Sequence, residues 1–473
     1  MRKVSGLLLS TERRAITGLA GLYATRMLGL FMVLPVLALY ADDLAGATPL
    51  LVGLALGIYG LTQAILQIPF GVMSDRLGRK PVIAAGLVLF LLGSVVAASA
   101  ESIAGVIVGR CLQGSGAVAA AIMALLADQT REQVRTAAMA TIGLSIGVAF
   151  AVAMVLGPWL AAGLGLAAVF WFTAGLAVLG LAVLAWLVPP APRRLRHRDV
   201  GIDRAQLGEI ITRADLWRLD LSIFALHLVL MAIFVAVPFR LVEAGIAVDR
   251  HGLTYLGVMA LAFVGMVPLV IVAEKRQRMK GMCLGAIAAI TLSLFGLGGL
   301  AGSSLALFAW LLLFFIAFNL LEATLPSMLS KLAPAGAKGT AMGIYSTSQF
   351  LGAFLGGVLG GFLAQQWGLA AVFLGAGLLA LAWGLVMLGM PAPPHLSSEV
   401  VALDDDHPED ALDTLMASFA EVAGVEDVLV VPEERLAYLK VDRRRLDEQA
   451  LARLTRSHRT GSKSDAAEQQ PRS

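Results

Sequence analysis

Long apolar runs separated by short polar breaks make up most of this chain. A helix needs about 20 mostly apolar residues to cross the hydrocarbon core of a bilayer, and twelve runs reach that length. They lie near residues 15–40, 50–73, 81–100, 102–127, 138–164, 167–188, 216–242, 253–272, 281–300, 303–330, 338–365 and 369–390. The pattern therefore predicts an all-α membrane protein with twelve transmembrane helices.

A charged break at residues 189–215 divides these runs into two sets of six. We assign residues 1–188 to an N-terminal six-helix half and residues 216–390 to a C-terminal six-helix half, joined by that linker loop. Membrane carriers with two such halves bind their substrate near the middle of the bilayer, between the halves. The layout therefore favours a transporter.

Lysine and arginine gather in alternate connections. The N-terminus, the central linker and the breaks near 74–81, 128–137 and 273–280 are basic, whereas the connections near 42, 101, 165, 302 and 367 contain neither residue. Only Arg240 and Arg250 interrupt the alternation. Because cytoplasmic loops are enriched in Lys and Arg, we expect both termini and the linker to lie in the cytoplasm.

Composition agrees with this interpretation. Of the 473 residues, 58% are hydrophobic and 15% are charged, whereas soluble domains carry about 25% charged residues. A net charge of +3 gives no basis for nucleic-acid binding. Cys111 and Cys283 show no metal-ligand or redox spacing, and no phosphate-binding loop or nucleophile motif appears. We therefore expect no metal, no cofactor and no enzyme activity.

The break after the second run carries the most specific motif. Residues 71–80 read GVMSDRLGRK, which matches the GxxxDRxGRR/K loop of the major facilitator superfamily at every specified position. The chain therefore resembles that superfamily. The resemblance implies a conformational latch, in which Arg79 pairs with Asp128 and Asp75 meets the positive N-terminal end of the eleventh span. The expected latch residues are Gly71, Asp75, Arg76, Gly78, Arg79, Lys80 and Asp128.

Two further elements resemble the same superfamily. Residues 110–116 read RCLQGSG, which is similar to its RxxQGxG element and places Arg110 inside the fourth span. Charge at that depth is costly and usually functional, although structural pairing with a carbonyl or a carboxylate is an alternative. The fifth span carries a glycine and Gly-Pro pattern that resembles antiporter members and implies a role in helix packing. Its residues are Gly143, Gly147, Gly157 and Pro158.

The resemblance runs through both halves and into the C-terminal region. Segments that begin at Arg26, Gly57, Ala153 and Gly339 carry it. It implies a proton-driven, drug-efflux-like carrier in the inner membrane of a bacterium. Its partners would be a small-molecule substrate, protons and membrane lipid.

Few charged or titratable residues lie deep in the runs. Those clearly inside are Arg26, Arg110, His227 and Glu322. Burial favours the protonated form of a carboxylate, so Glu322 is the first candidate for proton coupling, with the two arginines and His227 as associated residues. A fixed ion pair of Glu322 with Arg26 or Arg110 is the alternative, and His227 has a structural, hydrogen-bonded alternative.

Two uncharged polar stripes are candidates for the substrate cavity. Residues four apart share one face of a helix. The stripes are Tyr59, Gln63 and Gln67 in the second span and Tyr345 and Gln349 in the eleventh. Asn319, three residues before Glu322 on the same face of the tenth span, is a further candidate. Hydrogen bonding between helices is the alternative role. A mostly apolar cavity with scattered Gln and Tyr suits an amphipathic substrate.

A small soluble domain follows the last run. Residues 391–398 form a proline-rich linker, residues 399–456 alternate between strand and helix patterns, and residues 457–473 form a polar tail that we expect to be disordered. The order β-α-β-β-α predicts a ferredoxin-like domain. Its lack of cysteine argues against metal carriage, so regulation or self-association through this domain is the better expectation.

Together these features predict a secondary transporter that exports a small amphipathic or drug-like molecule in exchange for protons, by alternating access. A proton-coupled uptake symporter and a non-transporting membrane sensor on the same scaffold are the alternatives.

Overall fold

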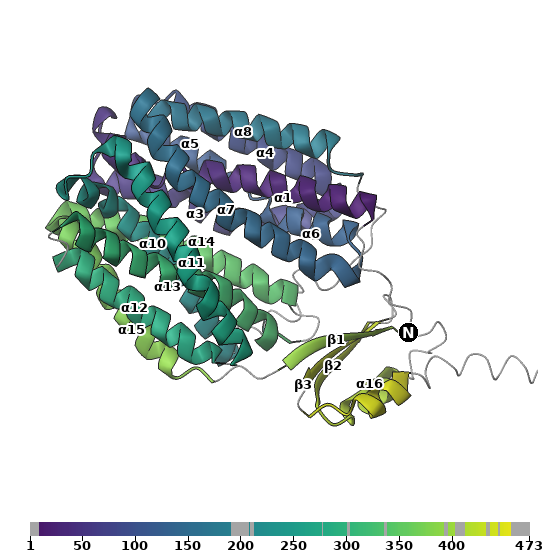
Figure 1. The fold of residues 1–473 in the computed structure, drawn as a ribbon. Helices are drawn as coiled ribbons and strands as arrows, with labels where there is room; N and C mark the ends of the chain where they lie inside the picture. The colour runs from purple at the N-terminus through teal and green to yellow at the C-terminus, as the bar shows by residue number, and fades with distance from the viewer. Residues whose placement is uncertain are drawn as a thin grey trace, which may run out of the picture. The chain divides into compact units, whose positions relative to one another are not determined.

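The structure is a computed structural model of the whole chain (Figure 1). It describes residues 9–190, 208, 212–276, 278–299, 303–334, 338–391, 396–402, 412–431, 436–442 and 445–455. Most of the predicted linker loop 189–215, part of the linker 391–398 and the tail 457–473 lie outside the described residues. The chain divides into two compact units. One comprises 1–196, 217–326 and 343–390, and the other comprises 197–216, 327–342 and 391–473.

The N-terminal half consists of long helices joined by short turns. They are α1 (Ser10–Phe31), α2 (Leu37–Tyr40), α3 (Pro49–Leu77), α4 (Arg79–Ala98), α5 (Ile103–Ser115), α6 (Ala119–Gln129), α7 (Glu132–Leu164) and α8 (Leu166–Trp186), with a 3-10 turn η1 (Ala41–Asp43). The run predicted at 15–40 is broken near Pro35, where the helix loses an N–H donor and the preceding residue is pushed out of helical geometry. The run at 102–127 is split into α5 and α6 after Gly116.

The C-terminal half repeats this arrangement. Its helices are α10 (Ala214–Glu243), α11 (His251–Lys275), α12 (Met279–Gly299), α13 (Ser304–Leu332), α14 (Lys338–Trp367) and α15 (Leu369–Leu388), with a 3-10 turn η2 (Val248–Arg250). A single glycine separates the last two helices of each half. Gly165 and Gly368 have φ angles of 80° and 81°, a region that side chains with a Cβ rarely adopt, so the chain reverses direction there within one residue.

Eleven helical segments of the described chain are long and apolar enough to cross a membrane, with α5 and α6 counted together as Ile103–Gln129. They correspond to the second through twelfth predicted runs, and α1 occupies the first. The twelve-span count therefore remains a prediction. Large apolar side chains point outward along these helices: Leu144 is 68% exposed, Val264 72% and Leu305 78%. Such a surface is suited to lipid rather than to water.

The C-terminal region forms a small three-stranded antiparallel sheet. Its strands β1 (Leu396–Ala402), β2 (Val425–Val431) and β3 (Leu436–Asp442) pair in the order β1-β3-β2. Helix α16 (Leu412–Ala420) contributes Leu415 and Phe419 to the core beneath the sheet, together with Leu439 from β3. The strands and α16 follow the predicted order, and residues 448–455 are helical. A fourth strand is not among the described residues, so the ferredoxin-like assignment remains a prediction.

Candidate functional site: latch, polar stripes and buried charges

The motif loop consists mostly of helical residues, with a one-residue turn between two helices. Helix α3 ends at Leu77, Gly78 adopts a φ of 100°, and α4 begins at Arg79. Only one non-helical residue separates the helices, and its φ angle favours glycine. The turn brings the guanidinium of Arg79 back over the last turn of α3, beside Ser74 and Asp75.

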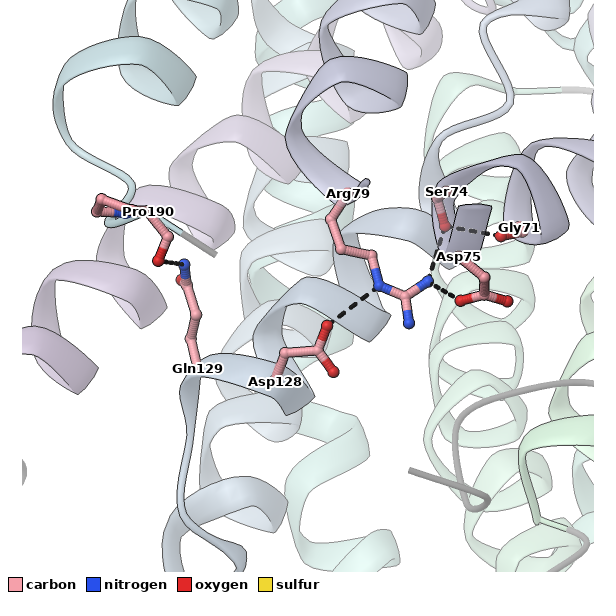
Figure 2. Close-up of polar contacts among 7 residues, drawn as sticks. All are labelled: Gly71, Ser74, Asp75, Arg79, Asp128, Gln129 and Pro190. Carbon is pink, nitrogen blue, oxygen red and sulfur yellow. Dashed lines mark hydrogen bonds and ion pairs between the residues drawn. The ribbon is translucent and has the colours of Figure 1, made fainter. Parts of the chain in front are cut away.

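Arg79 is the centre of the predicted latch (Figure 2). Its Nη1 donates to Ser74 Oγ at 2.8 Å and also contacts the Asp75 carboxylate, and its Nε donates to Asp128 Oδ2 at 3.1 Å. The side chains of Arg79 and Asp128 are 18% and 16% exposed, but that of Asp75 is 53% exposed. The carboxylate of Asp128 is therefore largely buried against Arg79. The carboxylate of Asp75 is exposed and can accept a hydrogen bond from another group. The side chain of Arg76 is exposed.

The same loop is tied to the end of α8. Lys80 Nζ donates to the carbonyl oxygen of Val188 at 2.6 Å. Gln129, which follows Asp128, donates to the carbonyl oxygen of Pro189 at 2.8 Å and to that of Pro190 at 3.4 Å (Figure 2). These bonds satisfy carbonyls just beyond the C-terminal end of a helix, where they have no helical partner.

Arg110 is held by backbone oxygens within the N-terminal half. Its Nε and Nη2 donate to the carbonyls of Ala55 and Leu56 at 3.3 and 3.4 Å, and its Nη1 donates to Gln113 Oε1 at 3.1 Å. The guanidinium also lies 5.1 Å from the centroid of the Tyr59 ring. Arg110 is fully buried, and this carbonyl pairing corresponds to the structural alternative for Arg110.

The predicted polar stripe of α3 converges on Arg26. Arg26 Nη2 donates to the hydroxyl of Tyr59 at 2.9 Å and to Gln63 Oε1 at 2.6 Å. Gln63 in turn donates to Gln67 at 3.4 Å. All four side chains are buried, so the stripe pairs with a charge from α1.

The C-terminal half places Glu322 beside His227. Glu322 Oε1 lies 3.4 Å from His227 Nε2, and the Gln349 side-chain amide lies 2.8 Å from the same ring nitrogen. The other ring nitrogen, Nδ1, is 3.2 Å from the carbonyl oxygen of Ile223. The Glu322 side chain is 34% exposed although it lies ten residues before the end of α13, but its Oε1, which faces His227, is shielded from solvent. Three predicted residues from three helices thus meet in one cluster.

Two other predicted residues of this half are buried without partners. Tyr345 is 3% exposed and Asn319 is 8% exposed. The Tyr345 hydroxyl and Asn319 Nδ2 form no hydrogen bond within the described chain. A residue that the sequence interpretation missed, Asp220 near the start of α10, also buries an unpaired oxygen, Oδ1. A carboxylate at the fifth position of the predicted span 216–242 was the available signal.

A second missed group is the ion pair of Glu12 with Arg131. The Glu12 carboxylate accepts bonds from Arg131 Nε at 2.7 Å, Nη2 at 2.9 Å and the backbone N–H at 3.1 Å. These bonds, with the side chain of Arg131 contributing most, hold the pKa of Glu12 at about 2. The pair ties the first turn of α1 to the residue that precedes α7, three positions after Asp128.

The glycines of α7 differ in their packing. A Cβ added to Gly157 would lie 2.3 Å from the carbonyl oxygen of Met32, whereas one added to Gly147 would meet only Phe263, at 3.6 Å, and one at Gly143 would meet nothing within 4 Å. Pro158 is accommodated inside the helix. Gly157 is thus the position at which α7 requires a glycine for close packing.

Helices α3 and α14 meet tightly at the end of the bundle opposite to the latch. A Cβ at Gly53 would lie 2.1 Å from the carbonyl oxygen of Gly357, and a Cβ at Gly57 would lie 2.5 Å from that of Phe354. Gly53 is near the beginning of α3, whereas the latch follows its end. This glycine seam therefore joins the two halves about 30 Å from the latch, at 1.5 Å of rise per residue.

Comparison with known proteins decides the family. The model of the Major Facilitator Superfamily matches residues 19–357 and, again, 290–424. The chain belongs to the major facilitator superfamily. The inner membrane transport protein YajR of Escherichia coli (strain K12) is 46% identical over 431 residues, which cover 91% of this chain and 94% of that protein.

More distant relatives agree with this assignment. The multidrug resistance protein MdtH of Aeromonas salmonicida (strain A449) is 27% identical over 328 residues, or 69% of this chain and 81% of that protein. A crystal structure of a D-xylose-proton symporter matches with a TM-score of 0.65 over 81% of this chain and 98% of that chain, at 16% identity. The latter match shows the fold. The chain is a membrane transporter of this superfamily and not an enzyme.

Proposed function

We propose that the chain is a proton-coupled antiporter that exports a small amphipathic molecule across the bacterial inner membrane. The observation that carries the proposal is the cluster of Glu322, His227 and Gln349, in which a carboxyl and an imidazole lie 3.4 Å apart within the C-terminal half. The names of YajR and MdtH support an inner-membrane location and a drug-like substrate for this chain.

The cluster can hold a proton in two arrangements. His227 Nδ1 faces a carbonyl oxygen, so it carries a hydrogen and leaves Nε2 to titrate. With a neutral ring, Nε2 accepts a hydrogen bond from the Gln349 amide and the proton resides on Glu322. With a charged ring, Nε2–H donates to an ionised Glu322, and Gln349 turns its amide oxygen toward the ring so that two N–H donors do not meet. The transported proton enters and leaves through this pair.

Alternating access uses the two ends of the bundle. The glycine seam between α3 and α14 closes one end, while the exposed carboxylate of Asp75 leaves the latch able to engage a further partner. In the opposite state, Asp75 engages the N-terminal end of α14 near Gly339, where the helix dipole favours a carboxylate, and the seam separates. The latch end faces the cytoplasm, and the C-terminal domain regulates the carrier or mediates self-association there.

Flux in proteoliposomes under an imposed pH gradient tests the proposal. The amphipaths 2-naphthoate, 2-naphthamide and 2-naphthylmethylamine would be offered with the lumen acidic, alkaline or at the external pH. We expect accumulation of at least one probe only when the lumen is acidic, and loss of that dependence in Glu322→Gln. Glu274→Gln, which alters an exposed carboxylate at the end of α11, is the matched control and should retain it.

The alternatives predict different results. A symporter would accumulate the probe with protons that enter from an acidic exterior. A sensor would bind a probe without any flux. Either result would contradict proton-coupled export.

A further inference from the structure

Arg26 is a buried cation with unused donors. The residue is 2% exposed, and all of its hydrogen bonds are made by Nη2, to Tyr59 and Gln63. Its Nε and Nη1 are shielded from solvent and have no partner within the described chain. A guanidinium carries five N–H donors and no acceptor, so the hydrogens on Nε and Nη1 of Arg26 can still donate to a ligand.

Within the part of the chain that the structure describes, no carboxylate forms an ion pair with Arg26. Its two partners, a phenol oxygen and an amide oxygen, are neutral. A buried charge without a counter-charge is strongly destabilising, and it persists at functional sites where a ligand completes the interaction.

The second buried arginine of the same half provides the contrast. Arg110 uses Nε, Nη1 and Nη2, and the face of Tyr59 lies 5.1 Å from it. Each of its nitrogens has an oxygen partner, and two of these oxygens are backbone carbonyls. Arg110 thus has a partner for every nitrogen without a ligand, whereas Arg26, which donates to the hydroxyl of the same Tyr59, does not.

Aromatic rings connect Arg26 with the proposed proton pair. Phe31, about one turn after Arg26 on α1, lies edge-on to Phe150 at 4.9 Å. Phe150 stacks with Phe318 at 6.4 Å, and Phe318 lies 5.9 Å from the His227 ring. Phe350 from α14 packs in the same apolar cluster as Tyr59. A ligand bound to Arg26 would therefore rest its body on aromatic surface that leads toward Glu322.

We propose that Arg26 binds the anionic group of the transported molecule, and that this molecule is an aromatic or otherwise amphipathic monoanion, such as a carboxylate or a sulfonate. The inference deepens the proposed transport function by naming its substrate class. Guanidinium groups bind carboxylates and similar oxyanions through charge-assisted hydrogen bonds. Tyr59 and Gln63 position the guanidinium, and the aromatic rings hold the apolar part of the ligand.

Thermal stability of the purified full-length protein in detergent tests the proposal without transport. Without ligand, Arg26→Met should melt at the same temperature as the wild type or higher, because the substitution removes an uncompensated charge. Arg110→Met, the matched control, should melt lower because it removes three hydrogen bonds at once, including the one that Gln113 Oε1 accepts. A fall in Arg26→Met as large as that in Arg110→Met would show a structural role and overturn the proposal.

Ligand binding supplies the second measurement. Melting temperatures would be recorded with 2-naphthoate, 2-naphthalenesulfonate, 2-naphthamide and 2-naphthylmethylamine at equal concentrations. We expect the two anions alone to stabilise the wild type, with apparent affinity at least tenfold weaker in Arg26→Met and partly restored in Arg26→Lys. Equal stabilisation by the amide, no stabilisation by either anion, or an unchanged response in Arg26→Met would overturn the proposal. If anions bind in an Arg26-dependent way but no flux follows a pH gradient, this inference stands and only the proposed proton coupling is contradicted.

Discussion

Lys80 caps the end of α8: its ammonium group donates to the carbonyl oxygen of Val188 at 2.6 Å. The C-terminal half contains the same relationship, because Lys280 donates to the carbonyl oxygen of Leu388 at 3.0 Å. Both pairs span 108 residues, and each lysine is the second residue of its helix, α4 or α12. The last residue of the motif loop is therefore one of two symmetric helix caps, in which a cation meets the negative end of a helix dipole.

This symmetry predicts matched effects of substitution. Lys80→Met and Lys280→Met should each lower the melting temperature by about 1 °C, since a cap is worth about 1 kcal/mol and the melting temperature of a long chain shifts little per kcal/mol. Lys80→Arg and Lys280→Arg should restore most of the loss. Thermal melts of the purified variants measure this. Normal stability of both methionine variants would show that these bonds contribute nothing.

The latch predicts loss of transport without loss of folding. Arg79→Ala breaks contacts with Ser74, Asp75 and Asp128 at once, so the two conformations should no longer interconvert normally. Arg79→Ala and Asp75→Asn should each reduce transport at least tenfold while expression and monodispersity remain unchanged. Glu274→Gln, at the exposed end of α11 and outside the latch, is the control. Wild-type flux in either latch variant would refute this role.

The glycine seam predicts a shift in conformation. Gly57→Leu would place a side chain against the backbone of Phe354, which lies within 2.5 Å of even a Cβ. The closed end should therefore separate. Spin labels at Asp43 and Gln366, in a background lacking Cys111 and Cys283, should report a longer distance in Gly57→Leu. Gly143→Ala, at a position with open space around it, should leave the distance distribution unchanged.

The ion pair of Glu12 with Arg131 predicts a pH dependence of stability. Its bonds to Arg131 lower the pKa of Glu12 from 4.5 to about 2, so its stabilisation is fully present above about pH 5 and is lost as the pH falls through about 2. The melting temperature of the wild type should exceed that of Glu12→Gln at pH 7, and the difference should disappear near pH 2. A constant difference across this range would exclude the carboxylate as its source.

Local sequence patterns were sufficient to predict the positions of the long helices and the residues of the latch. Apolar runs placed eleven long helices to within a few residues because lipid demands continuous apolar length. The pairing of Arg79 with Asp128 was implied by the resemblance of the motif loop to the superfamily, and the two side chains lie 3.1 Å apart. Pro35 and Gly116 interrupt two predicted spans because backbone restrictions can end a helix inside an apolar run.

The sequence by itself determined that the chain is a transporter of this superfamily, since hydropathy, loop charge and the motif at 71–80 are local properties. Tertiary structure decided the partners of the buried charges. Glu322 meets His227 rather than an arginine, Arg110 is satisfied by carbonyls, and Arg26 retains unused donors. Hydrogen bonds depend on distances of about 3 Å between atoms far apart in the chain, and only the packing of the helices sets those distances.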